Sequence, residues 1–351
     1  MKKILTGIKP TGTPHLGNYL GAIRPALEFV ENESRNESRN ESGLESYYFM
    51  ADYHALTTVH DPKVLKNYIR EVAATWLAFG LNVDKTVFFR QSDIPQVMEL
   101  SWILACFTSK GLMNRAHAYK ALLEQNSSNE DDPDAGINMG IYTYPILMAA
   151  DILLFDTDLV PVGQDQVQHI EIARDIAKAF NSRYATEGAV NTTENAADIL
   201  KLPTALIRKE VAVLPGLDGR KMSKSYNNTI PLFLPSEKLR KLIMKIKTDS
   251  TDPSAPKNPD DSLIFTIYAG FASEEQKSKM RERFLSGISW GVAKQELFEL
   301  MDSFLHEPRE KYNLLINNPD EIDKLLLKGK EKALVVAQKT IDRLRLAIGI
   351  N

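Results

Sequence analysis

The alternation of strand-like and helix-like segments over residues 1–230 is the feature that most limits the folds open to this chain. A short apolar run at Ile4–Gly7 precedes a helical pattern from about Leu16. The stretches "YYFMADYHAL" and "KTVFFRQSDI" repeat the strand pattern, with helical segments between them. Strands that alternate with helices at this spacing predict a parallel sheet covered on both faces, with right-handed crossovers. We therefore expect a Rossmann-like, doubly wound α/β domain.

The pattern changes near residue 230. Before it, "YPILMAADILLF" is apolar on every face and predicts a buried helix, and "LVPVGQDQVQHIEIARDIAKAFN" predicts a strand, a turn at Gly163 and an amphipathic helix. From about Leu232 onward all segments have helical periodicity. We expect an α/β catalytic domain at 1–230, an all-helical domain at 231–320, and a C-terminal helix at 321–351 that packs back on the first domain.

Residues 32–43 form a polar insertion in the first domain. The sequence "NESRNESRNESG" repeats a four-residue unit three times and contains no apolar side chain. The unit is too short to stack like a solenoid repeat. We interpret the segment as a solvated surface insertion.

The charge and the cysteine content limit the cellular compartment and the binding partners that are open to this protein. The net charge of -3 means that any nucleic-acid contact must come from a local basic face. Cys106 is the single cysteine, so an intramolecular disulfide is excluded and a reducing compartment is favoured. The apolar run at the start is too short for a signal peptide, and no stretch approaches the length of a membrane span. We expect a soluble, cytoplasmic protein.

The loop "GIKPTGTPHLGNYLGA" follows the first expected strand and leads into a helix. In open parallel sheets, ligands bind beyond the carboxyl ends of the strands, where the strand order reverses. The glycines of this loop permit close backbone approach, and the helix that begins at Leu16 offers free N–H groups to an anion. His15 and Asn18 lie near that helix start. The alternative is an ordinary turn, because the spacing is neither GxGxxG nor a Walker loop.

A second anion-binding candidate is "GRKMSKS", in which Lys221 and Lys224 flank Met222-Ser223. Lysine ammonium groups suit phosphate oxygens, and the polar, glycine- and serine-rich surroundings predict a loop that can close over a ligand. Two such loops flanking one α/β sheet indicate a nucleoside triphosphate as the ligand. A solvated charge run beside an unrelated turn is the alternative.

Asp151 is the charged residue of the apolar segment "YPILMAADI". A carboxylate on such a helix requires a partner when it is buried. It either lines a binding site or pairs with another part of the fold.

These stretches together resemble a known family. "PHLGN" and "KMSKS" look like the two signatures of class I aminoacyl-tRNA synthetases. Four stretches are similar to bacterial tryptophanyl-tRNA synthetases, namely Thr6–Ala22, Asp52–Thr57, Tyr144–Leu154 and Asp158–Glu171. The resemblance runs from about residue 4 to the last helix, apart from the insertion and part of Ala185–Ala197. It implies a ligase that activates tryptophan with ATP and transfers it to tRNA(Trp).

The resemblance also implies an ATP site, with catalytic roles for His15, Asn18, Lys221 and Lys224. The residues expected to contact ATP are Lys9, Pro10, Thr11, Gly17, Asn18, Gly163, Gln164, Asp165, Leu214, Lys221, Met222, Ser223, Lys224 and Ser225. Mg²⁺ would arrive with the nucleotide, and we expect no metal held by the protein itself. Lys9 departs from the family, where Gln is common, so a cation here could contact phosphate or weaken contact with the amino acid's ammonium.

The tryptophan pocket implied by the resemblance centres on Asp151. An indole presents one N–H in a flat apolar body, so its pocket needs one buried acceptor among apolar walls. Leu5 stands where the family often has Phe, which would loosen one wall. The residues expected to contact tryptophan are His54, Tyr144, Met148, Asp151, Val162 and Gln166.

The resemblance further implies a homodimer and an anticodon-binding helical domain. "SWILACFTSKGLMNRAHAYKALL" is the candidate interface, and "EKLRKLIMKIK" a candidate tRNA contact, although any amphipathic surface helix looks the same. Three alternatives remain: a tyrosine-specific relative, an RNA-binding paralogue without catalysis, and a small nucleotidyltransferase.

Overall fold

A five-stranded parallel sheet forms the centre of the protein, seen in a computed structural model that describes residues 2–37, 43–128, 132–184, 199–207 and 214–350. The strand order is β3-β2-β1-β4-β5, with bounds β1 Lys2–Ile8, β2 Leu44–Met50, β3 Thr86–Arg90, β4 Leu159–Val162 and β5 Thr204–Ile207. The predicted doubly wound parallel sheet is confirmed. The order reverses beside β1, so the loop after β1 leaves the sheet at the switch point.

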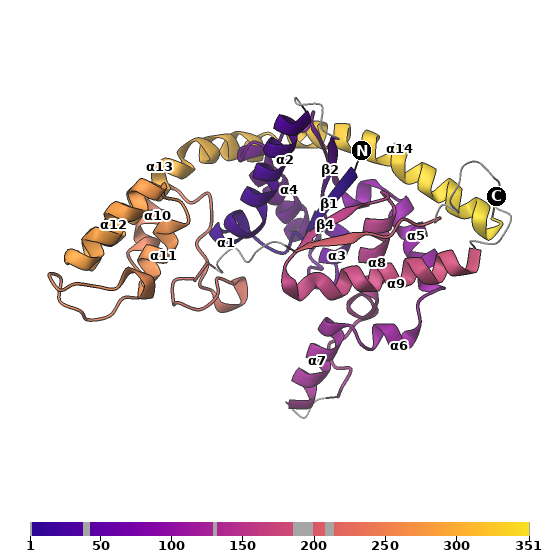
Figure 1. The fold of residues 1–351 in the computed structure, drawn as a ribbon, viewed down its shortest axis with the longest axis horizontal. Coiled ribbons are helices and arrows are strands. Elements are labelled where there is room, and N and C mark those ends of the chain that lie inside the picture. Colours follow the sequence, from indigo (N-terminus) through magenta and orange to yellow (C-terminus); the bar gives the residue numbers. More distant parts are fainter. Residues whose placement is uncertain (1, 38–42, 129–131, 185–198, 208–213, 351) are drawn as a thin grey trace.

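Helices cover both faces of the sheet and continue beyond it (Figure 1). Helical segments up to residue 230 are α1 Leu16–Asn18, η1 Tyr19–Ile23, α2 Arg24–Glu37, α3 Asp52–Ala55, α4 Pro62–Ala78, η2 Gln91–Asp93, α5 Gln96–Ala105, α6 Lys110–Met113, α7 His117–Ser128, α8 Met139–Leu153, η3 Gln164–Gln166, α9 Val167–Tyr184 and η4 Lys224–Tyr226. Those after it are α10 Ser236–Ile243, η5 Pro259–Asp261, α11 Leu263–Ala269, α12 Glu274–Ser286, α13 Trp290–Asn317 and α14 Pro319–Ile348.

Local sequence signals explain the ends of several helices. Asp61 caps α4 by accepting from the backbone N–H groups of Lys63 and Val64, and Pro62 occupies the first helical position. Asn138 caps α8 through the N–H of Ile141. The helix expected from Leu16 is interrupted, because η1 is a π-helical turn between α1 and α2.

The last helix, α14, lies along the edge strand β3. Its Gly329 packs directly on the strand, because a Cβ there would lie 1.9 Å from the Phe88 carbonyl oxygen. Arg343 and Arg345 form ion pairs with Asp156 and Glu99, at 2.6 and 2.7 Å. Figure 1 shows α14 running from α13 back across the α/β layer. The helix therefore covers an edge that would otherwise expose unpaired backbone groups.

The hydrophobic core on one face of the sheet continues into the helical region. A single buried cluster extends from Trp76 and Phe88 to Leu239 and Phe284. Gly270, at the end of α11, lies so close to Leu20 that a Cβ would stand 2.8 Å from its side chain. Within the described part of the chain, none of the helices combines the length and apolar character that a membrane span requires.

The polar insertion begins within α2, which continues to Glu37, while residues 38–42 lie outside the description. We predict that replacing Asn32–Ser42 by a short splice changes the rate of the reaction implied by the sequence resemblance by less than about twofold, because the segment holds no apolar side chain that a core could lose. Steady-state kinetics and thermal unfolding of the deletion variant test this. A large fall in both the reaction rate and the thermal unfolding temperature would show that the insertion supports the fold.

Candidate active site

The first cavity lies at the carboxyl ends of β1 and β4 and has a volume of about 680 Å³. Leu5, Thr6 and Gly7 of β1, Phe49 of β2 and Val160 of β4 contribute to its walls. Six lining residues were expected from the sequence, namely His54, Tyr144, Met148, Asp151, Val162 and Gln166. The structure thus brings together in one cavity all the residues assigned to tryptophan.

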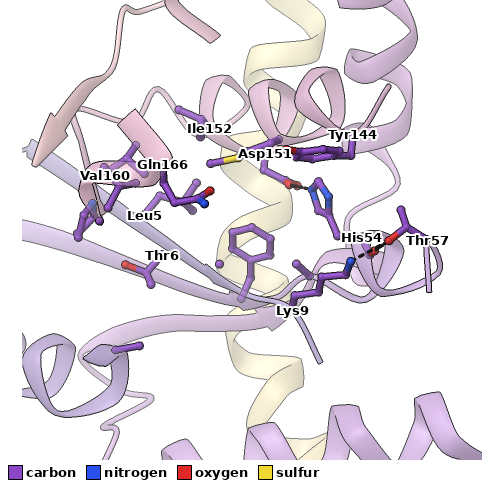
Figure 2. A pocket seen from close by; sticks show the side chains of 18 of the residues that line it. Leu5, Thr6, Lys9, His54, Thr57, Tyr144, Asp151, Ile152, Val160 and Gln166 are labelled. Carbon is purple, nitrogen blue, oxygen red and sulfur yellow. Dashed lines mark hydrogen bonds and ion pairs between the residues drawn. The ribbon is translucent and has the colours of Figure 1, made fainter. Parts of the chain in front are cut away.

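Asp151 is the buried acceptor of this cavity, with 3% of its surface exposed. Its Oδ2 accepts from His54 Nε2 at 2.9 Å, and Gln91 Nε2 donates to Oδ1 and Oδ2 at 2.7 and 2.9 Å. Burial raises the pKa of Asp151, and the hydrogen bonds from His54 and Gln91 offset part of that rise. Figure 2 shows Asp151 meeting His54 at the cavity. The carboxylate is held in one orientation while it still borders the cavity.

Tyr144 and Gln166 border the same space from α8 and η3 (Figure 2). The Tyr144 hydroxyl is hydrogen-bonded to His169 Nε2 at 3.0 Å, and burial raises the pKa of Tyr144 to about 12. Tyr144 is therefore a neutral hydroxyl at physiological pH.

A second cavity, also of about 680 Å³, adjoins the first. It is bordered by the two loops that carry the expected signatures, residues 9–18 and 214–232, which we call the signature loops. Its lining residues that were expected from the sequence are Lys9, Thr11, His15, Gly17, Asn18, Leu214, Lys221, Met222, Ser223 and Lys224. Backbone bonds join the loops, from Leu16 N–H to the Ile230 carbonyl at 3.0 Å and from Leu232 N–H to the Pro14 carbonyl at 3.2 Å. The two signatures, far apart in sequence, face one space.

The two loops also pack against each other at Gly12 and Lys224. Gly12 has φ +138°, and a Cβ there would lie 2.9 Å from the Lys224 ammonium nitrogen. A glycine suits both the conformation and the contact. Burial and the nearby Lys224 charge lower the pKa of His15 to about 4, so His15 is neutral at physiological pH. Its Nδ1 is buried and lacks a hydrogen-bond partner among the described residues.

Lys9 borders both cavities. Its Nζ donates to Thr57 Oγ1 at 2.8 Å, and that hydroxyl donates to the His54 carbonyl at 2.8 Å. Partial burial lowers the pKa of the Lys9 ammonium. Figure 2 shows Lys9 reaching toward Thr57 at the end of the first cavity. Among the described residues, the ion pairs of the structure include none with Lys9.

Five further residues were expected from the sequence to contact ATP. Gly163 borders the first cavity, whereas in the described part of the chain Pro10 and Gln164 border neither cavity. Pro10 is buried and Gln164 is exposed. The side chains of Asp165, in η3, and Ser225, in η4, lie outside the description.

Gln91 and Thr57 support the site but were not expected from the sequence. Gln91 is fully buried and holds Asp151, and Thr57 holds Lys9. Gln91 comes directly after β3, and a polar residue at the carboxyl end of a strand was an available signal. The described residues contain no group of three or more His, Cys, Asp or Glu side chains arranged to hold a metal ion.

The fold and these two cavities agree with the relationship of the chain to known proteins. The family model for tRNA synthetases class I (W and Y) matches residues 1–306. The chain therefore belongs to the class I tRNA synthetases of the tryptophan and tyrosine group.

Individual relatives narrow this class. The chain is 52% identical to the tryptophan–tRNA ligase of Pseudomonas aeruginosa, with 99% of the chain and 74% of that protein covered. It is 47% identical to the tryptophan–tRNA ligase of Neisseria meningitidis serogroup A, with 100% and 98% covered. The crystal structure of the Campylobacter jejuni tryptophanyl-tRNA synthetase, complexed with ADP and tryptophan, has a TM-score of 0.85 at 39% identity and 99% coverage of both chains. Within its class, the chain belongs to the bacterial tryptophan–tRNA ligases.

Proposed function

We propose that the two adjoining cavities are the two substrate sites of the reaction, with tryptophan in the first and ATP in the second. The single observation that carries this proposal is the geometry at their border, where the Asp151 cavity and the signature-loop cavity share Lys9, Gly21 and Thr58. Substrates in these cavities would meet at the shared border. Their reacting groups would be held next to each other, which favours the reaction by proximity.

The chain catalyses the reaction of a tryptophan–tRNA ligase, which has two steps. In the first, a carboxylate oxygen of tryptophan attacks the α-phosphorus of ATP, the bond from that phosphorus to the bridging oxygen breaks, and pyrophosphate leaves. The product is tryptophanyl-adenylate. In the second, a hydroxyl of the terminal tRNA ribose attacks the activated carbonyl, and AMP leaves.

Asp151 is the proposed acceptor of the indole N–H. It is the buried carboxylate that borders the first cavity, and Gln91 fixes its orientation. Leu5, Met148 and Val162 would contact the indole ring, and the polar groups of Tyr144 and Gln166 would bind the ammonium group. Binding a ligand without an N–H would leave Asp151 with an unsatisfied acceptor, so phenylalanine would be rejected. A tyrosine-specific site would instead need a partner for a phenolic hydroxyl.

Lys9 is proposed to contact the reacting groups. Lys9 borders both cavities, and its ammonium is held by the neutral hydroxyl of Thr57. The tryptophan carboxylate and the α-phosphate of ATP would both lie near it. Pairing with such anionic groups would stabilise a partly buried ammonium group.

The second cavity is proposed to hold ATP. Lys221 and Lys224 would bind the phosphates that leave as pyrophosphate, the neutral His15 and Asn18 would donate hydrogen bonds, and a backbone contact near Leu214 would bind adenine. Gly163, Gln164 and Asp165 are proposed for the ribose and adenosine. Mg²⁺, bound to the phosphate oxygens of ATP, would neutralise part of their charge.

The helical region is proposed to bind the anticodon part of tRNA(Trp). In α10 and the turn after it, Leu239, Ile243 and Ile246 are buried, whereas the basic side chains are exposed. The exposed basic residues are Lys238, Arg240, Lys241, Lys245 and Lys247. Such a basic face suits the tRNA backbone. We further propose that the protein acts in the cytoplasm.

The protein is proposed to act as a homodimer that pairs through α5. Trp102 of α5 is 74% exposed, which is unusual for so large an apolar side chain. We predict that Trp102→Glu converts a dimer into monomers in analytical ultracentrifugation, because a buried, unpaired carboxylate opposes association. Leu314→Glu is the matched control, since Leu314 is 72% exposed on α13. A monomeric unmodified protein, or equal behaviour of both variants, would contradict the α5 interface.

Pyrophosphate exchange into ATP, measured with each of the twenty amino acids, tests the proposed function. We expect exchange with tryptophan and background rates with the others. Exchange with tyrosine instead would favour the tyrosine-specific alternative, and background rates with all twenty would favour an RNA-binding paralogue. Charging of tRNA(Trp) with radiolabelled tryptophan tests the second step.

A further inference from the structure

Asn228 occupies the centre of the second signature loop and is 2% exposed. Its Oδ1 accepts from the Ser223 backbone N–H at 2.8 Å. Its Nδ2 donates to Asp218 Oδ1 at 2.7 Å and to the Lys221 carbonyl at 3.1 Å. One side chain thus binds both peptide segments that carry Lys221 and Ser223, together with the start of the loop.

The backbone closes the loop around Asn228. The Leu217 N–H donates to the Asn228 carbonyl at 3.0 Å, and the Met222 N–H donates to the Leu214 carbonyl at 3.0 Å. Gly216 packs directly on Asn228, because a Cβ there would lie 2.3 Å from the Asn228 side chain. The stretch from Leu214 to Asn228 is therefore a cross-linked unit.

The same network separates the three cations of the loop. Asp218, which accepts from Asn228, also accepts from Arg220 Nε at 2.7 Å. The Arg220 guanidinium lies over the Tyr226 ring, 4.3 Å from its centroid. The hydrogen bond from Asn228, followed by those from Arg220, lowers the pKa of Asp218 to about 2, so its charge persists at physiological pH. Within the described residues, Lys221 and Lys224 border the nucleotide cavity and Arg220 does not.

We propose that Asn228 is a positioning residue for activation, which holds the loop in one shape so that Lys221 and Lys224 face the nucleotide while Arg220 is retained by Asp218. This inference rests on the proposed function of the two lysines. In this view the loop moves as one piece when it closes, and the spacing of its two lysines does not change. The effect of Asn228 on catalysis passes through those lysines.

Asn228→Ala is expected to lower kcat of tryptophan-dependent pyrophosphate exchange about 30-fold, since the loop loses several hydrogen bonds that fix its shape. The equilibrium dissociation constant for tryptophan, measured by calorimetry without ATP, is expected to change by less than about twofold, because the tryptophan cavity is separate. Unchanged kcat, or an equal loss in tryptophan affinity, would overturn the proposal. Asn228→Ser replaces the alanine variant should that variant not fold.

Asn181→Ala is the matched control. Asn181 is a buried asparagine in α9 that bonds to both the N–H and the carbonyl of Leu200, at 2.9 and 2.8 Å, away from both cavities. Its loss is expected to lower thermal stability and leave kcat within about twofold. A loss of kcat comparable to that of Asn228→Ala would show that reduced stability alone explains the effect.

A double-mutant cycle with Lys224→Ala separates this inference from the function on which it rests. In the Lys224→Ala background, adding Asn228→Ala is expected to lower kcat by less than about tenfold, because Lys221 is then the one of the two lysines that remains to be positioned. A full 30-fold further loss would overturn the inference and leave the role of Lys224 intact. Failure of the proposed function would be seen separately, as an unchanged kcat in Lys224→Ala alone.

Discussion

Lys224→Ala is expected to lower kcat of tryptophan-dependent pyrophosphate exchange by about 100- to 1000-fold. The Lys224 ammonium packs beside Gly12 of the first signature loop, and Lys224 borders the nucleotide cavity. Negative charge grows on the leaving pyrophosphate as the bond to the α-phosphorus breaks. A fixed cation at that place stabilises the transition state more than bound ATP, so kcat falls more than the ATP affinity. Exchange kinetics at saturating tryptophan measure both quantities.

Arg220→Ala is the matched control for this variant. Arg220 is a cation of the same loop, but it is paired with Asp218 at 2.6 Å and does not border the nucleotide cavity in the described structure. Its loss is expected to change kcat by only a few-fold. The tryptophan dissociation constant should be the same in both variants as in the unmodified protein. Equal losses of kcat in the two variants, or a parallel loss of tryptophan affinity in Lys224→Ala, would mean that the loop has a structural role.

The parallel sheet and the two loops could be predicted because their signals are local. Ile4–Gly7 has the apolar pattern of a strand, and Gly12 and Gly17 mark a loop that leads into a helix. In the structure the same glycines admit neighbouring groups, since a Cβ at Gly17 would lie 3.1 Å from the His15 ring. Three signals indicate the same place in the fold. They are the apolar pattern of the strand, the glycines of the loop, and the rule that ligands bind where the strand order of an open parallel sheet reverses. The location of the site followed from that agreement.

The supporting contacts could not be predicted, because they join residues far apart in sequence. Gln91 meets Asp151 across 60 positions, and Lys9 meets Thr57 across 48. No periodicity encodes such a pair, since it depends on how α3, α8 and the end of β3 pack together. Gly329 of α14 is a further case, where direct packing on the Phe88 backbone explains a glycine within a long helix. These contacts follow from tertiary packing.

Asp151→Asn is expected to raise the KM for tryptophan about 10- to 100-fold. The present carboxylate only accepts hydrogen bonds, and it receives them from His54 and from Gln91. An asparagine would turn its amide N–H₂ toward one of these donors, so at least one buried N–H would lose its partner. The amide oxygen would then be shared between the remaining donor and the indole N–H. Asp52→Asn is the matched control, because Asp52 is a buried carboxylate close to His54 that does not border the cavity in the described structure.

The same variant makes a second, independent prediction about stability. Burial raises the pKa of Asp151 above its unfolded value, so folding favours the protonated carboxyl group. The stability that this group contributes is present below the unfolded pKa and is lost as the pH rises through the folded pKa. As the pH rises above the unfolded pKa, ionising this buried group therefore opposes folding, whereas an asparagine does not titrate. Relative to the unmodified protein, the free energy of unfolding of Asp151→Asn should increase between pH 4 and pH 7, as measured by urea denaturation. A difference that stays constant over this range, together with an unchanged KM for tryptophan, would mean that Asp151 is neither the buried titrating group nor the acceptor of the indole.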